Sequence, residues 1–411
     1  MDATFMTALH ICHVRHLKNI DIPLSEEKRK TLILTGKNGS GKTSVLEALE
    51  TFLEYVVSEE YQTKEQCKAS IQLYEKKLNG PKNTEEEKEE AKKAQKLLDF
   101  FKRKHLWWTD GAIAEFPSYA DLREKYKKGE YILAYYGDNR KIQVQISKDI
   151  EKVDLKPMYS IKEHPGQQLV KYLVNLKTTE AFARTGGNQQ RADEIKDWFS
   201  RFERVLQEIY EDETLTLNFN IETFEFTISQ NGREPFSFNA MSMGYAAVFD
   251  IVADLMMRME SKRRYDVEGL VLVDEIESHL HVELQKKIVP ILMKLFPNIQ
   301  FLLTTHSPFI LNSTPNAVVY DLETGKLVKD GLTKLPYEGI VEGYFGADLL
   351  SEELRKKFNE YQKIAEKKEL TDEDFARAAE LELYLDEVPD YLALDFAAEY
   401  GRLKLEMSER G

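Results

Sequence analysis

The 411-residue chain predicts an α/β fold, a mixed sheet flanked by helices, with an inserted helical hairpin and a helical C-terminal region. Three observations support this fold class. Apolar strands alternate with amphipathic helices along most of the chain. A glycine-rich loop at 36–43 joins one such strand to one such helix. Charged segments with helical periodicity interrupt the alternation at 59–104 and follow it from 337 onward.

The length of 411 residues allows two or three domains, and the 42% of apolar residues allow a large core. No apolar run approaches the roughly 20 residues that span a bilayer. The N-terminus lacks a basic stretch followed by a long apolar one, so no signal peptide is expected. With two cysteines, Cys12 and Cys67, we expect a reduced, cytoplasmic protein without membrane contact. The net charge of −14 argues against a uniformly basic, nucleic-acid-coating surface but allows a local basic groove.

The first elements are two short strands over 9–24, a buried strand at 31–35 and a helix at 44–57. From 59 to 104, apolar residues recur at helical spacing among many charges. A turn follows at Asn79-Gly-Pro-Lys-Asn, and Thr84 with Glu87 forms a capping box for a second helix. We predict an antiparallel hairpin that projects from the domain. A solvated arm and a partner-binding arm both fit its charges.

The remaining elements follow from the same periodicities. Their expected ranges are strands at 131–136 and 141–146, helices over 166–210 with a loop at 184–190, strands at 215–219 and 224–229, a helix at 244–259, a strand at 269–273, a helix at 282–295, a strand at 301–304 and a strand pair over 316–328. Beyond 337 we expect short acidic helices.

The loop at 36–43, Gly-Lys-Asn-Gly-Ser-Gly-Lys-Thr, fits the G-x-x-x-x-G-K-[ST] phosphate loop and lies between a strand and a helix, as that motif requires. Its N–H groups converge on one point at a helix N-terminus, which favours a triphosphate. Lys42 should reach the β- and γ-phosphates of ATP, and the Thr43 hydroxyl should ligate Mg²⁺. The expected ATP-binding residues here are Gly36, Lys37, Asn38, Gly39, Ser40, Gly41, Lys42, Thr43 and Ser44.

Two further strands deliver polar residues at their ends. The strand 269–273 leads into Asp274 and Glu275. Asp274 can hold the Mg²⁺ shell, and Glu275 can deprotonate the attacking water as the catalytic base. The strand 301–304 leads to His306, where a γ-phosphate could be contacted. A turn-capping role for this histidine is the alternative.

The sequence Met241-Ser242-Met243-Gly244-Tyr245 begins a long amphipathic helix just before the acidic strand. Ser242 offers a hydroxyl, and the helix start offers free N–H groups to an anion. An ordinary helix cap is the alternative for these five residues alone.

In this order, the four motifs resemble the ATP-binding-cassette (ABC) superfamily of AAA-family ATPases, in its soluble chromosome-maintenance (SMC), RecF and OLD-type branch. The resemblance covers roughly 5–60 and 125–325 and implies an ABC-type P-loop ATPase core. It also implies a homodimer or higher homo-oligomer, in which Ser242 and Gly244 contact the partner's γ-phosphate and 278–281 line the dimer seam. The signature departs from Leu-Ser-Gly-Gly at Met241, Met243 and Tyr245. Candidates for the nucleotide lid are Gln143, Gln145 and Arg140.

The resemblance sets the expected domains: the first part of the ATPase core (1–58), an inserted arm (59–125), the rest of the core (126–335) and an acidic helical C-terminal region (336–411). Within the superfamily, the chain looks like ATPases of anti-phage systems, such as PtuA of Septu and AriA of PARIS. That likeness implies a sensor or regulator of a separate nuclease effector. The alternative is a DNA-repair or chromosome-handling ATPase that contacts DNA directly. A transporter subunit is disfavoured, because about 200 residues separate phosphate loop and signature.

Overall fold

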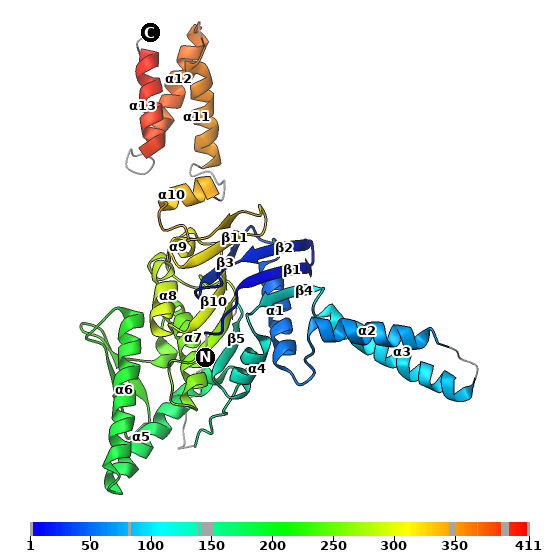
Figure 1. Ribbon diagram of the computed structural model, residues 1–411. Coiled ribbons are helices and arrows are strands. Elements are labelled where there is room, and N and C mark those ends of the chain that lie inside the picture. Colours follow the sequence, from blue (N-terminus) through cyan, green and yellow to red (C-terminus); the bar gives the residue numbers. More distant parts are fainter. Residues whose placement is uncertain are drawn as a thin grey trace. The chain divides into compact units, whose positions relative to one another are not determined.

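The computed structural model describes residues 3–80, 84–138, 140, 152–344, 351–367, 369–387 and 394–408. This described chain divides into two compact units, Met1–Leu335 and Pro336–Gly411 (Figure 1). In the described residues, no helix is long and apolar enough to cross a membrane. The strand expected at 141–146, with Gln143 and Gln145, lies outside the described residues.

The central sheet of the first unit contains six described strands in the order β12-β11-β3-β10-β9-β5. Neighbouring strands run parallel, except that β12 is antiparallel to β11. This mixed sheet, flanked by helices, confirms the predicted α/β class. The strands are β3 (Thr31–Thr35), β5 (Tyr131–Tyr136), β9 (Glu268–Val273), β10 (Ile299–Thr304), β11 (Ala317–Asp321) and β12 (Leu327–Val328).

A second sheet has three described strands in the order β2-β1-β4, all antiparallel. They are β1 (Ala8–Val14), β2 (Leu17–Pro23) and β4 (Gly111–Glu115). The helix α1 (Lys42–Val57) shares one apolar core with this sheet and with one face of the central sheet. That face is formed by alternate strand residues, Leu32, Leu34, Leu270, Leu272 and Leu302. The phosphate-loop helix is therefore fixed at the centre of the unit.

The arm consists of α2 (Lys64–Leu78) and α3 (Glu85–Leu106), which pair along their length and project from the first unit (Figure 1). The predicted capping box of Thr84 and Glu87 is present, and Thr63 with Gln66 forms another. The stretch assigned to the arm, 59–125, also contains β4 and most of α4 (Tyr119–Lys127), two elements that were not predicted from the sequence. Since β4 pairs with β1, this part of the stretch belongs with the second sheet, and the domain bounds stay a prediction.

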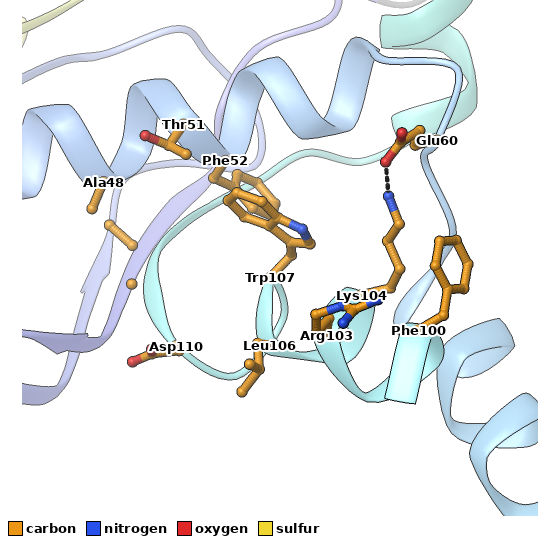
Figure 2. A pocket seen from close by; sticks show the side chains of 12 residues that line it. Ala48, Thr51, Phe52, Glu60, Phe100, Arg103, Lys104, Leu106, Trp107 and Asp110 are labelled. Atoms are coloured by element: carbon orange, nitrogen blue, oxygen red, sulfur yellow. Dashed lines mark hydrogen bonds and ion pairs between the residues drawn. The ribbon is translucent and has the colours of Figure 1, made fainter. Parts of the chain in front are cut away.

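Aromatic rings join the root of the arm to α1. Trp107 stacks on Tyr55 with ring centroids 5.2 Å apart, and Trp108 meets Phe52 edge-on at 5.4 Å. Beside them lies a pocket of about 620 Å³, between α1, the end of α3 and β4 (Figure 2). Lys104 crosses its edge to pair with Glu60. The root is therefore packed directly on the helix that begins at the phosphate loop.

The rest of the first unit begins with a segment of helices and short strands. The helices that precede and follow β9 and β10 complete it. Its elements are η1 (Pro165–Gln168), α5 (Leu169–Thr185), α6 (Gln189–Tyr210), β6 (Thr216–Phe219), β7 (Phe226–Ser229), β8 (Phe236–Ser237), η2 (Phe238–Ala240), α7 (Met243–Glu260), α8 (Val282–Leu295) and α9 (Pro308–Leu311). The strands β6, β7 and β8 form a small antiparallel sheet. The predicted helices at 244–259 and 282–295 are confirmed by α7 and α8.

The second unit is helical, as predicted. It contains α10 (Tyr337–Gly339), a π-helical turn (Ile340–Tyr344), α11 (Glu352–Ala365), α12 (Asp372–Leu385) and α13 (Leu394–Ser408). The last three share an apolar core of their own, with Phe358, Tyr361, Leu381 and Phe396 buried in it. This unit therefore has a core that does not depend on the nucleotide domain.

Candidate active site

The phosphate loop curls because three of its glycines adopt a left-handed backbone. Gly36, Gly39 and Gly41 have φ values of 136°, 83° and 98°, a region that favours glycine over residues with a Cβ. At Gly36, an added Cβ would also lie 2.8 Å from Ser40 Oγ. Gly41 forms the N-cap of α1. The sequence therefore places a tight turn directly before a buried helix.

Lys42 lies under this loop and is 5% exposed. Its Nζ donates to the carbonyl oxygens of Gly36 at 2.9 Å and Lys37 at 3.2 Å. Burial lowers its pKa, and the charges of Glu275 and Asp274 act in the opposite direction. The three side chains are thus close enough to influence one another, although they come from α1 and from the end of β9.

The two acids follow β9 and are held by the neighbouring strand β10. Asp274 is 2% exposed and accepts a hydrogen bond from the Thr304 hydroxyl. The same hydroxyl oxygen accepts a bond from the Glu275 backbone N–H at 2.7 Å. Glu275 has a φ of 44°, which is uncommon for a residue with a side chain. Its carboxylate accepts a bond from the Ser278 hydroxyl at 3.3 Å.

Arg140 follows β5, the strand on the other side of β9. Its guanidinium donates to the carbonyl oxygen of Asp274 at 2.9 Å and to that of Glu275 at 2.6 Å. Of the three lid candidates, Arg140 is within the described residues, and it contacts the backbone of the acids.

His306 follows β10, two residues after Thr304. Its backbone N–H donates to the Glu277 carboxylate. Burial lowers the pKa of its imidazole, and the nearby Lys42 charge adds to this effect, so the neutral form is favoured at pH 7. The ends of β3, β9 and β10 therefore bring the phosphate loop, the two acids and this histidine to one edge of the sheet.

The predicted signature lies at the start of α7. Ser242 is the N-cap residue and is exposed, and its hydroxyl makes no capping bond. Gly244 is buried, and an added Cβ would lie 3.1 Å from the carbonyl oxygen of His279. Among the described residues, no hydrogen bond or ion pair joins Ser242 to the phosphate loop of the same chain. The structure thus places Gly244 against the loop after Glu275, and Ser242 two residues before it at the start of α7.

The residues at this sheet edge fit MgATP. The Ser40 hydroxyl and Thr35 hydroxyl are buried without a hydrogen-bond partner, and the Thr43 side chain is exposed beside Lys42. Within the described chain, no group of three or more His, Cys, Asp and Glu residues could hold a metal. A Mg²⁺ site here would take Thr43 and Asp274 together with phosphate oxygens and water, as this ion commonly does. The site assignments stay predictions.

Sequence reasoning overlooked Thr304 and the contacts of Arg140. Thr304 had a usable signal, because it ends a buried strand next to β9 and its side chain can reach the residue that follows Val273. The contacts of Arg140 had no such sequence signal, because they depend on the pairing of β5 with β9, two strands that are far apart in sequence.

A family model described as "AAA domain, putative AbiEii toxin, Type IV TA system" matches residues 32–312. The Septu protein PtuA of Bacillus mycoides (strain KBAB4) is 24% identical over 323 residues, or 75% of this chain and 39% of that protein. The retron Ec83 probable ATPase of Escherichia coli is 36% identical over 94 residues, or 22% of this chain and 17% of that protein. The chain thus spans less than two thirds of the length of these two relatives. The SMC head domain from Thermotoga maritima is 13% identical over 80% of this chain and 99% of that one, with a TM-score of 0.36.

Proposed function

The chain belongs to the family described as AAA domain, putative AbiEii toxin, type IV TA system, and we propose that it hydrolyses MgATP at the described sheet edge to control a separate nuclease effector in anti-phage defence. It is an ATPase related to the PtuA and retron ATPases. The observation that carries the hydrolysis proposal is that the phosphate loop, the acids Asp274 and Glu275, and His306 follow the ends of three neighbouring parallel strands, β3, β9 and β10.

Each residue has a role that follows from its position. The loop N–H groups and Lys42 bind the phosphates, and Lys42 can leave its two carbonyl partners for phosphate oxygens of higher charge. Thr43 and Asp274 would hold Mg²⁺, which neutralises charge on the phosphates when bound. Glu275 orients a water molecule and takes its proton. Neutral His306 donates or accepts a hydrogen bond at the γ-phosphate.

The signature residues act, in this proposal, on ATP held by a second copy of the chain. Ser242 is exposed with a free hydroxyl at the N-terminus of the 18-residue helix α7. A helix N-terminus with an exposed hydroxyl favours an anion. Within the described residues, no hydrogen bond or ion pair ties Ser242 to the phosphate loop of its own chain, so the proposal places the bound phosphate on the partner. Two protomers would then close around ATP.

The arm and the C-terminal unit are the proposed contact surfaces for partners. The arm is packed on α1, so a change at the phosphate loop has a direct structural route to it. The C-terminal unit exposes Leu383 (74%) and Leu405 (68%) on its own helices. We assign one surface to the nuclease and the other to ATPase assembly, with the C-terminal unit favoured for assembly. Phe345, Leu349 and Leu350 form an apolar group in the acidic C-terminal sequence that could also serve as a subunit contact, and they lie outside the described residues.

The test is a comparison of wild-type protein with the Glu275→Gln variant. Removal of the base should slow ATP hydrolysis by about 10²–10⁴-fold while ATP binding is retained. The ATP-bound assembly should then accumulate and be visible in mass by light scattering, and a nuclease encoded beside this chain should co-purify with it. Hydrolysis near the wild-type rate would refute the role of Glu275. DNA-stimulated hydrolysis with a linear log-salt dependence, and no nuclease, would favour direct action on DNA.

A further inference from the structure

The backbone N–H and the backbone carbonyl of Glu275 are each hydrogen-bonded to a side chain from another segment. Thr304 ends β10, and Arg140 follows β5. Its N–H donates to Thr304 Oγ1 at 2.7 Å, on the β10 side. Its carbonyl oxygen accepts from Arg140 Nη2 at 2.6 Å, on the β5 side. Asp274 is held likewise, since its N–H donates to the Tyr136 carbonyl at 2.8 Å and its carbonyl accepts from Arg140 Nη1 at 2.9 Å. The chain turns into the left-handed Glu275 conformation between these anchors.

Arg140 makes these contacts from a buried position. It is 6% exposed, and its Nε atom is buried without a hydrogen-bond partner. Burying a guanidinium is costly, and the charges around it offset part of that cost. Burial lowers the Arg140 pKa, whereas the nearby carboxylates of Glu277, Asp250 and Asp274 raise it. One cation therefore lies near several acids, which come from the segment after β9 and from α7.

From this geometry we propose that Arg140 is a positioning residue for hydrolysis, which fixes the Asp274–Glu275 backbone so that the Glu275 carboxylate is aimed at the attacking water. The inference rests on the proposed function, in which Glu275 is the base. A left-handed conformation strains a residue that has a side chain, so it persists only where the surrounding contacts hold it. Without Arg140, the backbone at Glu275 leaves the left-handed conformation, and the carboxylate no longer points at the attacking water.

The guanidinium is suited to this role because its fork donates two roughly parallel bonds. Lysine has one nitrogen on a flexible stem and cannot reproduce the paired contact with two successive carbonyls. Comparing Arg140→Lys with Arg140→Ala therefore separates the effect of the positive charge, which lysine keeps, from the effect of the two paired hydrogen bonds, which both variants lose. A matched control is Arg258→Lys, since Arg258 is also 6% exposed and donates to the carbonyls of Leu133 and Ser160. Arg258 pairs with Asp254, and its partners are remote in sequence from Asp274 and Glu275.

The experiment measures kcat, the ATP dissociation constant and the melting temperature for each variant. Arg140→Ala should lower kcat by about 10²-fold, because a shift of about 1 Å in a catalytic group has an effect of this size. Arg140→Lys should lie between Arg140→Ala and wild type, and the dissociation constant should stay within about threefold. Arg258→Lys should lower the melting temperature without this loss of kcat. Equal losses of kcat in Arg140→Lys and Arg258→Lys at matched stability would overturn the proposal.

A double variant tests whether Arg140 acts through Glu275. In the Glu275→Gln background, Arg140→Ala should change the residual rate by less than about threefold, because the group being aimed is already lost. Independent, multiplying losses would overturn the positioning role. If Glu275→Gln alone leaves hydrolysis unchanged, the proposed function fails. If Glu275→Gln is inactive and Arg140→Ala is fully active, only the Arg140 inference fails.

Discussion

The Thr304 hydroxyl donates a hydrogen bond to the Asp274 carboxylate across the neighbouring strands β10 and β9. The same oxygen receives the Glu275 N–H, so one side chain positions the proposed Mg²⁺ ligand and the proposed base together. Thr304→Val should therefore lower kcat about tenfold or more. It should also reduce the free energy of unfolding by about 1–3 kcal/mol, the cost of leaving buried partners unsatisfied.

Steady-state kinetics and urea unfolding check the Thr304 prediction, with Thr304→Ser as the control that keeps the hydroxyl. If Thr304→Ser and Thr304→Val are equally impaired, the methyl packing matters and the shared hydroxyl does not.

Lys42→Ala should abolish measurable ATP binding while the fold survives. Lys42 supplies positive charge to two phosphates, whereas the loop shape is set by the backbone of Gly36, Gly39 and Gly41. The loss should be seen by isothermal titration calorimetry, with unchanged circular dichroism as evidence of folding. A near-wild-type affinity would remove Lys42 from the site. Lys294→Ala is a useful control, because Lys294 lies outside the phosphate loop and pairs with Glu208 at 2.7 Å on the surface.

Ser242→Arg should leave ATP binding by each protomer intact and reduce hydrolysis. A bulky cation at the start of α7 would block access of the partner's γ-phosphate to the helix N-terminus. Turnover as a function of protein concentration, together with ATP binding, separates the two effects. The matched control is Ser200→Arg, another exposed serine of the same unit, on α6. If both variants turn over like wild type, Ser242 is a helix residue without a role in hydrolysis.

His10 should make the second sheet more stable at mildly acidic pH. Partial burial acts to lower its pKa, but hydrogen bonds to Asp21 at 2.6 Å and Glu115 at 2.9 Å outweigh burial, and the pKa is raised from 6.5. Because the folded pKa exceeds the unfolded value, the stabilisation is full below about pH 6.5 and is lost as pH rises through the folded pKa. His10→Gln should thus lower the melting temperature most at pH 5.5–6 and least at pH 9. A difference from wild type that does not vary with pH would contradict this.

Removal of the distal arm should leave ATP binding unchanged and disrupt a partner contact. Cys67 and Trp108 belong to the main core, so the root must be kept. A variant with a Gly-Ser link in place of 70–97 retains these residues, and a second variant ends at Leu335, the boundary between the two units. At least one should lose its co-purifying protein or its oligomeric mass in light scattering. If both keep the same mass and partners, neither segment is an interaction surface.

Much of this fold could be predicted from local pattern, because apolar strands such as Leu32-Ile-Leu and helices with clear caps such as Thr84 with Glu87 need little context. The missed strand β4 depended on distant pairing. The strand β4 has five residues, two of them alanines, and it is defined by its pairing with β1 about 100 residues earlier. The phosphate loop and acids had sequence motifs. Of the residues that anchor those acids, Thr304 could have been found because it ends a buried strand beside β9, whereas the contacts of Arg140 depend on the pairing of β5 with β9 and have no local pattern.

The close approach of Gly244 to the His279 carbonyl sets a limit on how the signature can diverge. An added Cβ at 3.1 Å would require the loop after Glu275 to shift by a few tenths of an ångström. Met243, in contrast, is 72% exposed and has room for many side chains. A library of variants across 241–245 should therefore tolerate exchange at 243 and select glycine at 244. Divergence of the signature is constrained here by its own protomer, before any partner is bound.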